Sequence, residues 1–75
     1  MNIKLNDLRK TVITTGYLIL FQQHEALYED GLYYSSILLS VLTGKGLEPI
    51  NVFYKSVKQR DEDYDRLTKV FIKDE

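Results

Sequence analysis

The spacing of apolar residues along the chain predicts helices rather than strands. From residue 13 onward, side chains of one stripe recur at intervals of three and four residues, as on one face of an amphipathic helix. Asn6 or Asp7 can cap the start of this helix, so we expect it over about residues 7–29. The β-branched run at residues 11–15 favours a strand instead and leaves helix or strand open for residues 10–21. The stripe consists of Ile13, Tyr17, Leu20, His24, Leu27 and Tyr28.

Turn-forming residues divide the rest of the chain into two further elements. Asp30-Gly31 predicts a turn, and residues 32–43 are apolar around most of a helical circumference, which is typical of the central helix of a bundle. Gly44 suits the left-handed conformation that ends such a helix. Pro49 is favoured at a first helical position, so the third helix is expected over about residues 49–73. The acidic run at residues 61–63 allows a break near residues 60–63.

These elements predict an all-α fold, a small bundle of three helices, or of four if the last one breaks. Residues 1–75 fit a single domain, and a domain of this size buries only about 60% of the surface that its unfolded chain exposes. The sequence contains no cysteine, so disulfides and thiolate metal sites cannot compensate. We therefore expect the bundle to be completed by self-association, with a homodimer as the favoured state.

The residue inventory gives little support to catalysis. His24 is the only histidine, so a two-histidine metal site cannot form within one chain. Glu25 and Glu29 lie one turn apart on the expected helix, where a solvated face is a better interpretation than a shared cation. The sequence around Gly44 is too short for a phosphate-binding loop. We predict a protein without enzyme activity, cofactor or metal.

Charge is uneven along the chain, although its net value is only −1. Residues 31–60 hold four basic residues against one acidic residue. Within them, the segment 39–58 resembles part of a helix-turn-helix, because Ser40, Gly44 and Ile50 fit the small, turn and aliphatic positions of that motif. Lys45 and Thr43 depart from it. The resemblance implies an alternative function, a dimeric DNA-binding transcriptional regulator that uses Asn51, Lys55 and Lys58.

Aromatic residues are the most unusual feature of the composition, with six tyrosines and three phenylalanines. Tyrosine is enriched at interfaces, because its ring is apolar while its hydroxyl can stay in water. Three short helices have more apolar surface than they can cover, which favours a partner. We expect a small non-catalytic protein–protein interaction module, a homo-oligomeric adaptor, regulator or assembly accessory protein such as a phage or mobile element encodes. The expected contacts are Tyr17, Phe21, Tyr33, Tyr34 and Tyr54.

The chain shows no export or membrane signal. Its longest uninterrupted apolar run is residues 17–21, whereas a helix needs roughly 20 apolar residues to span a bilayer. The N-terminal residues lack the basic and apolar regions of a signal peptide. We therefore expect a cytoplasmic protein without a membrane partner.

Overall fold

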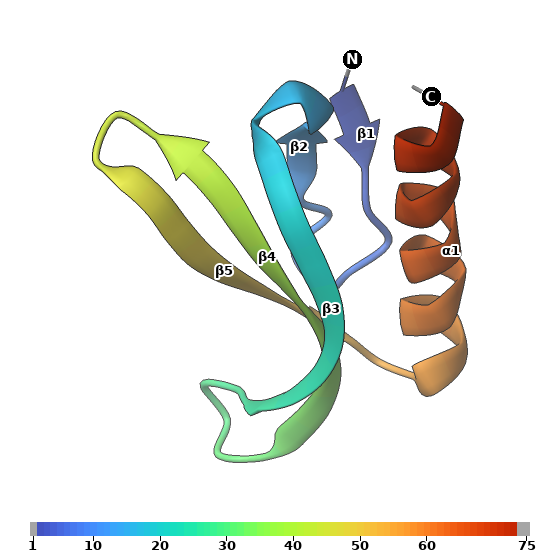
Figure 1. Cartoon of the computed structure of the whole chain (residues 1–75). Coiled ribbons are helices and arrows are strands. Elements are labelled where there is room, and N and C mark those ends of the chain that lie inside the picture. Colours follow the sequence, from blue (N-terminus) through green and yellow to red (C-terminus); the bar gives the residue numbers. More distant parts are fainter. Residues whose placement is uncertain (1, 74–75) are drawn as a thin grey trace.

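The backbone is built mainly from antiparallel strands, followed by one helix (Figure 1). A computed structural model describes the backbone of residues 2–73, together with their side chains except those of residues 15 and 71–73. Strands β1 (Asn2–Lys4) and β2 (Val12–Thr14) form a two-stranded sheet. A short 3₁₀ turn, η1 (Thr15–Tyr17), leads into a second sheet of order β3-β4-β5. Its strands are β3 (Leu18–Leu27), β4 (Tyr33–Thr43) and β5 (Gly46–Tyr54), and helix α1 spans Val57–Lys73.

The predicted all-α bundle is therefore wrong. Most of residues 7–29 and 32–43 form strands instead of helices, and the strand alternative for residues 10–21 holds at residues 12–14 and 18–21. Strand β4 lies between two neighbours in the sheet. Its residues 37–39 are consecutive apolar residues, and its serines lie on both faces, so the strand lacks the strict alternation of apolar and polar residues that marks a half-exposed strand. The third predicted helix exists only from residue 57, and it continues through residues 60–63 without a break.

The predicted turn at Asp30-Gly31 is formed, whereas Pro49 lies within a strand instead of at the start of a helix. The Asp30-Gly31 turn joins β3 to β4, and Gly31 has the left-handed φ of 84° that other residues adopt at a cost. On β5, the Phe53 carbonyl accepts a hydrogen bond from the Leu8 N–H at 2.8 Å, so it faces the edge away from β4. Backbone groups alternate along a strand, so Pro49 faces the same edge, where its missing N–H breaks no bond to β4.

The core lies between the inner face of the three-stranded sheet, the β1–β2 pair and α1. The buried apolar residues of β4 and β5 alternate along each strand, and the register places Ile37 directly opposite Val52 on this inner face. Ser36 is buried as well, although it lies on the other face of β4. The remaining positions form the outer face of the sheet, which α1 and β1–β2 leave uncovered (Figure 1). The core residues are Ile3, Leu5, Ile13, Leu18, Ile37, Leu39, Val52, Tyr54 and Leu67.

The connection from β1 to β2 is held by the buried side chain of Asp7. Its carboxylate accepts hydrogen bonds from the Thr11 N–H at 2.7 Å and from the Thr11 hydroxyl at 2.6 Å. Lys10, just before Thr11, has a φ of 53°, a left-handed conformation that is strained for a residue with a Cβ atom. Asp7 thus fixes where β2 begins and how its edges are oriented.

Candidate functional site

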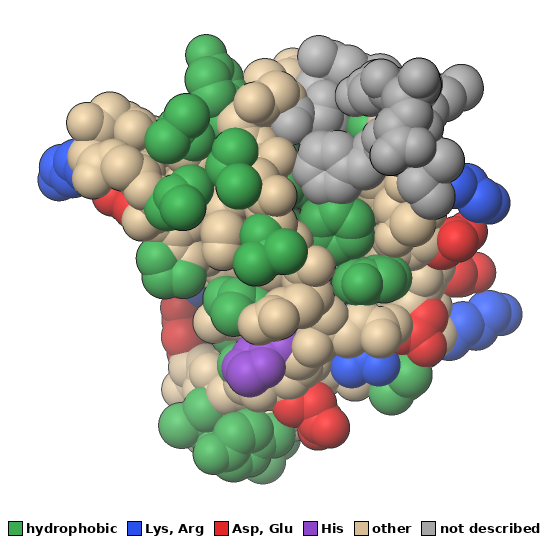
Figure 2. All heavy atoms as spheres, viewed as in Figure 1, with side chains coloured by type: hydrophobic (Ala, Val, Ile, Leu, Met, Phe, Trp, Pro, Cys, Tyr) green, Lys and Arg blue, Asp and Glu red, His purple; other side chains and the backbone are tan. Residues whose placement is uncertain are grey.

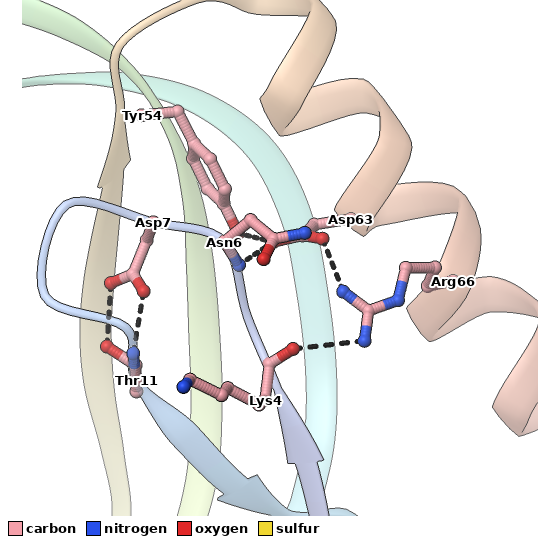
Figure 3. A network of polar contacts seen from close by, with 7 residues as sticks. All are labelled: Lys4, Asn6, Asp7, Thr11, Tyr54, Asp63 and Arg66. Carbon is pink, nitrogen blue, oxygen red and sulfur yellow. Dashed lines mark hydrogen bonds and ion pairs between the residues drawn. The ribbon is translucent and has the colours of Figure 1, made fainter.

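The densest group of polar side chains joins α1 to the segment after β1 and to the end of β5 (Figure 3). Asp63 is fully buried, and its carboxylate accepts hydrogen bonds from the Asn6 N–H at 2.6 Å, the Tyr54 hydroxyl at 2.9 Å and the Arg66 guanidinium at 2.7 Å. Arg66 also donates to the carbonyl of Lys4 at 3.0 Å. Burial and the hydrogen bond to Asp63 raise the pKa of Tyr54 well above its ordinary value, so its hydroxyl remains a donor.

This network is closed to a substrate. One carboxylate oxygen of Asp63 accepts from Asn6 and Tyr54, and the other accepts from Arg66. Tyr54 and Asp63 are both buried, so neither can touch a molecule at the surface, as an acid or base in catalysis must. We therefore assign the network to the fold, where it holds α1 against the β1 segment.

The single histidine does not belong to a cluster of metal ligands. No group of three or more His, Cys, Asp or Glu side chains that could hold an ion is found within the described part of the chain. His24 and Glu25 are successive residues of β3, so their side chains point to opposite faces of the sheet. Glu29 forms an ion pair with Arg9. The side-by-side arrangement of Glu25 and Glu29 that a helix would produce is therefore not formed.

The five predicted interface residues do not share one surface. Tyr33 is 74% exposed where β4 begins, and Tyr17 is 59% exposed in the turn before β3. Phe21 and Tyr34 are half-buried against other aromatic rings. Tyr54 is 1% exposed and belongs to the core. The surplus of aromatic residues thus serves packing at three of these five positions.

Part of that packing holds the tip of the β3–β4 hairpin against the N-terminal segment that contains Arg9. The Tyr28 ring meets the Tyr34 and Phe53 rings edge to face, with centroids 5.4 and 4.8 Å apart. The guanidinium of Arg9 lies 5.8 Å from the Tyr28 centroid and also pairs with Glu29. A depression of about 190 Å³ adjoins this cluster. Arg9 already covers the Tyr28 ring and its charge is neutralised by Glu29. We therefore assign this cluster to the packing of the β3–β4 hairpin tip against the N-terminal segment.

The predicted helix-turn-helix is absent from the segment 39–58. This segment contains the end of β4, all of β5 and only the first two residues of α1. Asn51 lies in β5, Lys55 follows that strand, and Lys58 lies at the start of α1. These three residues therefore do not form one face of a recognition helix, which is how that motif reads the major groove.

The outer face of the three-stranded sheet carries a patch without Asp, Glu, Lys or Arg. Two rows cross all three strands, one through Leu20, Ser40 and Pro49, the next through Gln22, Leu38 and Asn51. Figure 2 shows hydrophobic side chains gathered on this face, while charged side chains lie over α1 and at the margins. We name as the uncharged patch the residues Leu20, Gln22, His24, Leu38, Ser40, Leu42, Leu47, Pro49 and Asn51.

Sequence reasoning missed this patch because its residues are neighbours in the folded sheet, across paired strands, and are not neighbours along the chain. Leu20, Leu42 and Leu47 are 58%, 48% and 60% exposed. Leu20 and Leu42 belong to two different predicted helices, and Leu47 belongs to the segment between the second and the third. Among residues 20–26 and 36–42, Glu25 alone is an Asp, Glu, Lys or Arg residue. This scarcity of charge was the available signal, and treating the segments as strands assigns Glu25 to the face opposite the patch.

A second apolar surface is a groove of about 220 Å³ beside β2. Residues 11–14 form one side of it, and no charged residue lines it. The opposite side consists of apolar residues from η1, β4 and β5: Tyr17, Leu39, Val41, Leu42 and Ile50. Of the predicted interface residues, only Tyr17 takes part in either apolar surface.

Two findings bear on the class of protein. Among the described residues, no helix has the length and apolar composition needed to cross a membrane. Comparison of the chain with protein-family models, with curated proteins and with solved structures finds no match.

Proposed function

We propose that this chain is a small non-catalytic protein-binding module that acts as a homodimer through the uncharged patch. The observation that carries the proposal is the lack of Asp, Glu, Lys and Arg at nine neighbouring positions of an exposed sheet face. A two-fold dimer brings a patch against itself. A charged residue near the axis would then face its own copy, and burying unpaired charges is costly. A face without Asp, Glu, Lys or Arg has no such obstacle.

The area of the patch is sufficient for a weak dimer. Its three exposed leucines leave on the order of 300 Å² of accessible surface, and the whole patch roughly 600 Å², judged from side-chain sizes. Two copies would bury about 1,200 Å², which is the lower end of stable specific interfaces. The chain exposes 5184 Å² in all, against about 4,800 Å² expected for a compact monomer of its mass. This surplus surface agrees with the proposal.

The shape of the patch is self-complementary. Ser40 lies between Leu20 and Pro49 in its row and has the smallest side chain of the three, and we infer a hollow at this position of β4. Leu42 lies two residues further along the same strand and projects from the same face. A two-fold axis that passes between Ser40 and Leu42 places each Leu42 over the partner's hollow. The two sheets then stack about 10 Å apart, as in other sheet-on-sheet packings.

The experiment is the molar mass in solution across a concentration series, measured by size exclusion with light scattering. Leu47→Asp puts a charge into the patch, and Leu32→Asp is the matched control, since Leu32 is 61% exposed outside the patch and Leu47 is 60% exposed within it. We expect the wild type and Leu32→Asp to approach 17.6 kDa, twice the 8.8 kDa chain. Leu47→Asp should remain at 8.8 kDa with an unchanged circular dichroism spectrum.

Two outcomes would refute the dimer. The wild type could stay at 8.8 kDa up to high micromolar concentration. Alternatively, both variants could dimerise as the wild type does, which would place the contact elsewhere on the molecule. Ser40→Arg offers an independent check, because it fills the hollow and adds a charge at the centre of the patch.

A further inference from the structure

We propose that the free edge of β2 accepts an extended, apolar segment of a partner protein, which adds to the β1–β2 sheet as a third strand. This site lies beside the groove described above and shares only Leu42 with the uncharged patch. It therefore goes beyond the proposed dimer and does not depend on it.

The hydrogen-bond pattern between β1 and β2 shows which backbone groups face this edge. The Leu5 N–H donates to the Thr11 carbonyl at 2.8 Å, so these opposed residues are a hydrogen-bonded pair. In an antiparallel ladder, bonded and non-bonded pairs alternate. Val12 and Thr14 are therefore in non-bonded pairs, and their N–H and C=O groups point away from β1.

The opposite edge of the same sheet agrees with this alternation. Lys4 is the residue of β1 that faces Val12 in the register. Its carbonyl points away from β2 and accepts a hydrogen bond from Arg66 of α1 at 3.0 Å. The outer edge of β1 is thus covered by the helix. Outside the helices and strands of the described part of the chain, no hydrogen bond is found for the Val12 N–H, the Val12 carbonyl or the Thr14 N–H. The Thr14 carbonyl directly precedes η1, and its position is that of the acceptor of the first i→i+3 bond of this turn.

The groove lies directly on this edge. It is lined by the four consecutive residues 11–14. Successive side chains of a strand point in opposite directions, so four consecutive residues can line one groove only if the backbone edge itself forms the wall. The facing wall carries the apolar side chains of Leu39, Val41 and Ile50.

These two walls favour an extended peptide as the occupant. One wall offers the N–H groups of Val12 and Thr14 and the carbonyl of Val12 at the spacing of a strand. The other wall offers apolar contact for every second side chain, which is the pattern of β-strand addition. The groove holds about 220 Å³, more than the ~150 Å³ of a cavity that binds benzene, so it has room for one or two small aliphatic side chains. A charged side chain would find no partner there.

The β1–β2 pair has too few and too short strands to be stable as a sheet by itself. It has two strands of three residues each, and two-stranded sheets are at best marginally stable on their own. A third strand at the β2 edge would complete the backbone hydrogen bonds of Val12 and Thr14. The inserted strand would lie between β2 and the apolar side chains of β4 and β5.

The test uses a capped hexapeptide of alternating valine and threonine as the probe, titrated into ¹⁵N-labelled protein. A second peptide of the same sequence, N-methylated on every residue, has no N–H left to donate to a strand edge from either side. The Val–Thr peptide should shift the amide signals of residues 11–14 and slow the hydrogen exchange of Val12 and Thr14, and the methylated peptide should not. In the free protein these two amides should exchange faster than that of Ile13, which is bonded to β1.

A protein variant tests the same edge from the other side. Val12→Pro removes an outward N–H and leaves the bonds to β1 in place, while Val12→Thr is the matched control that keeps the N–H and the β-branched shape. Val12→Pro should weaken peptide binding at least tenfold, and Val12→Thr should bind within about twofold of the wild type. If Val12→Pro fails to fold, the comparison of the two peptides on the wild type still decides the question.

Several results would overturn the proposal. One is equal binding of both peptides or of Val12→Pro, and another is a lack of binding at millimolar peptide. A third is protection of Val12 and Thr14 that rises with protein concentration alone, which would make a second copy the occupant. Leu47→Asp separates this inference from the proposed dimer, since it should be monomeric and still bind the Val–Thr peptide.

Discussion

Replacing Tyr54 with Phe tests whether the buried network around Asp63 holds the helix to the rest of the fold. The substitution keeps the aromatic ring and removes only the hydroxyl that donates to Asp63 at 2.9 Å. Tyr54 is 1% exposed and Asp63 is 0% exposed, so water has no access to replace the lost donor. The carboxylate keeps its hydrogen bonds from Asn6 and Arg66.

The expected loss is a large part of the total stability. A hydrogen bond to a charged group contributes about 1.5–3 kcal/mol. At 0.05–0.15 kcal/mol per residue, a chain of 75 residues has a free energy of unfolding of about 4–11 kcal/mol. Since 1 kcal/mol shifts the Tm of a domain this small by about 4–8 °C, Tyr54→Phe should lower the Tm by roughly 6–24 °C. Asp63→Ala should cost more, because three donors then lose their acceptor together.

The assay is urea unfolding followed by circular dichroism, with Tyr64→Phe as the control. Tyr64 also lies against the sheet, with its ring 5.2 Å from that of Phe21, but its hydroxyl is not part of the network. In an Asp63→Ala background, Tyr54→Phe should have little further effect, since its acceptor is already gone. A loss below about 0.5 kcal/mol for Tyr54→Phe, or a loss equal to that of Tyr64→Phe, would refute the structural role of the network.

Three further changes in stability follow from single residues. Burial and then Asp63 raise the pKa of Tyr54, so the folded protein keeps the hydroxyl proton, whereas the tyrosine of the unfolded chain ionises at its ordinary pKa of 10.0. The free energy of unfolding should therefore fall above pH 10 by up to about 1.4 kcal/mol per pH unit. In the same pH titration, Tyr54→Phe should lack this loss. The Ser36 hydroxyl is buried without a hydrogen-bond partner in the described part of the chain, so Ser36→Cys should stabilise the reduced protein by about 1 kcal/mol in urea unfolding, whereas the same change at the half-buried Ser40 should not. Lys10 has a φ of 53°, so Lys10→Gly should raise the Tm, with a gain of about 1 kcal/mol, and Lys10→Ala, which keeps a Cβ atom, should not.

Local turn chemistry was predictable from the sequence, whereas the type of the elements between turns was not. The Asp30-Gly31 turn and the break at Gly44 both separate elements as expected. Residues 57–73 are helical within the predicted span of 49–73. The prediction failed at residues 13–28, where apolar residues recur at intervals of three and four and therefore matched a helical pattern. Most of this segment is a strand, and an irregularity between Leu18 and Leu20 shifts its register.

The candidate surfaces were less predictable than the turns. The five predicted contacts are all aromatic, because aromatic residues are common at interfaces. The uncharged patch, however, contains no aromatic residue, and the groove is lined mainly by leucine, valine and isoleucine. Both surfaces depend on residues that are distant in the sequence. Pairing between strands brings them together, and the register of that pairing cannot be derived from spacing along one segment.

The sequence by itself determined where the chain turns, which segments are apolar and that disulfides play no part, because these properties belong to single residues and their immediate neighbours. Only the tertiary structure decided that the apolar segments are strands. A β-strand gains its hydrogen bonds from other strands, so its stability depends on partners far along the chain, whereas a helix makes its bonds within itself. The same dependence decided that Asp63 lies in a buried network, that one sheet face is free of charge, and that the edge of β2 remains open.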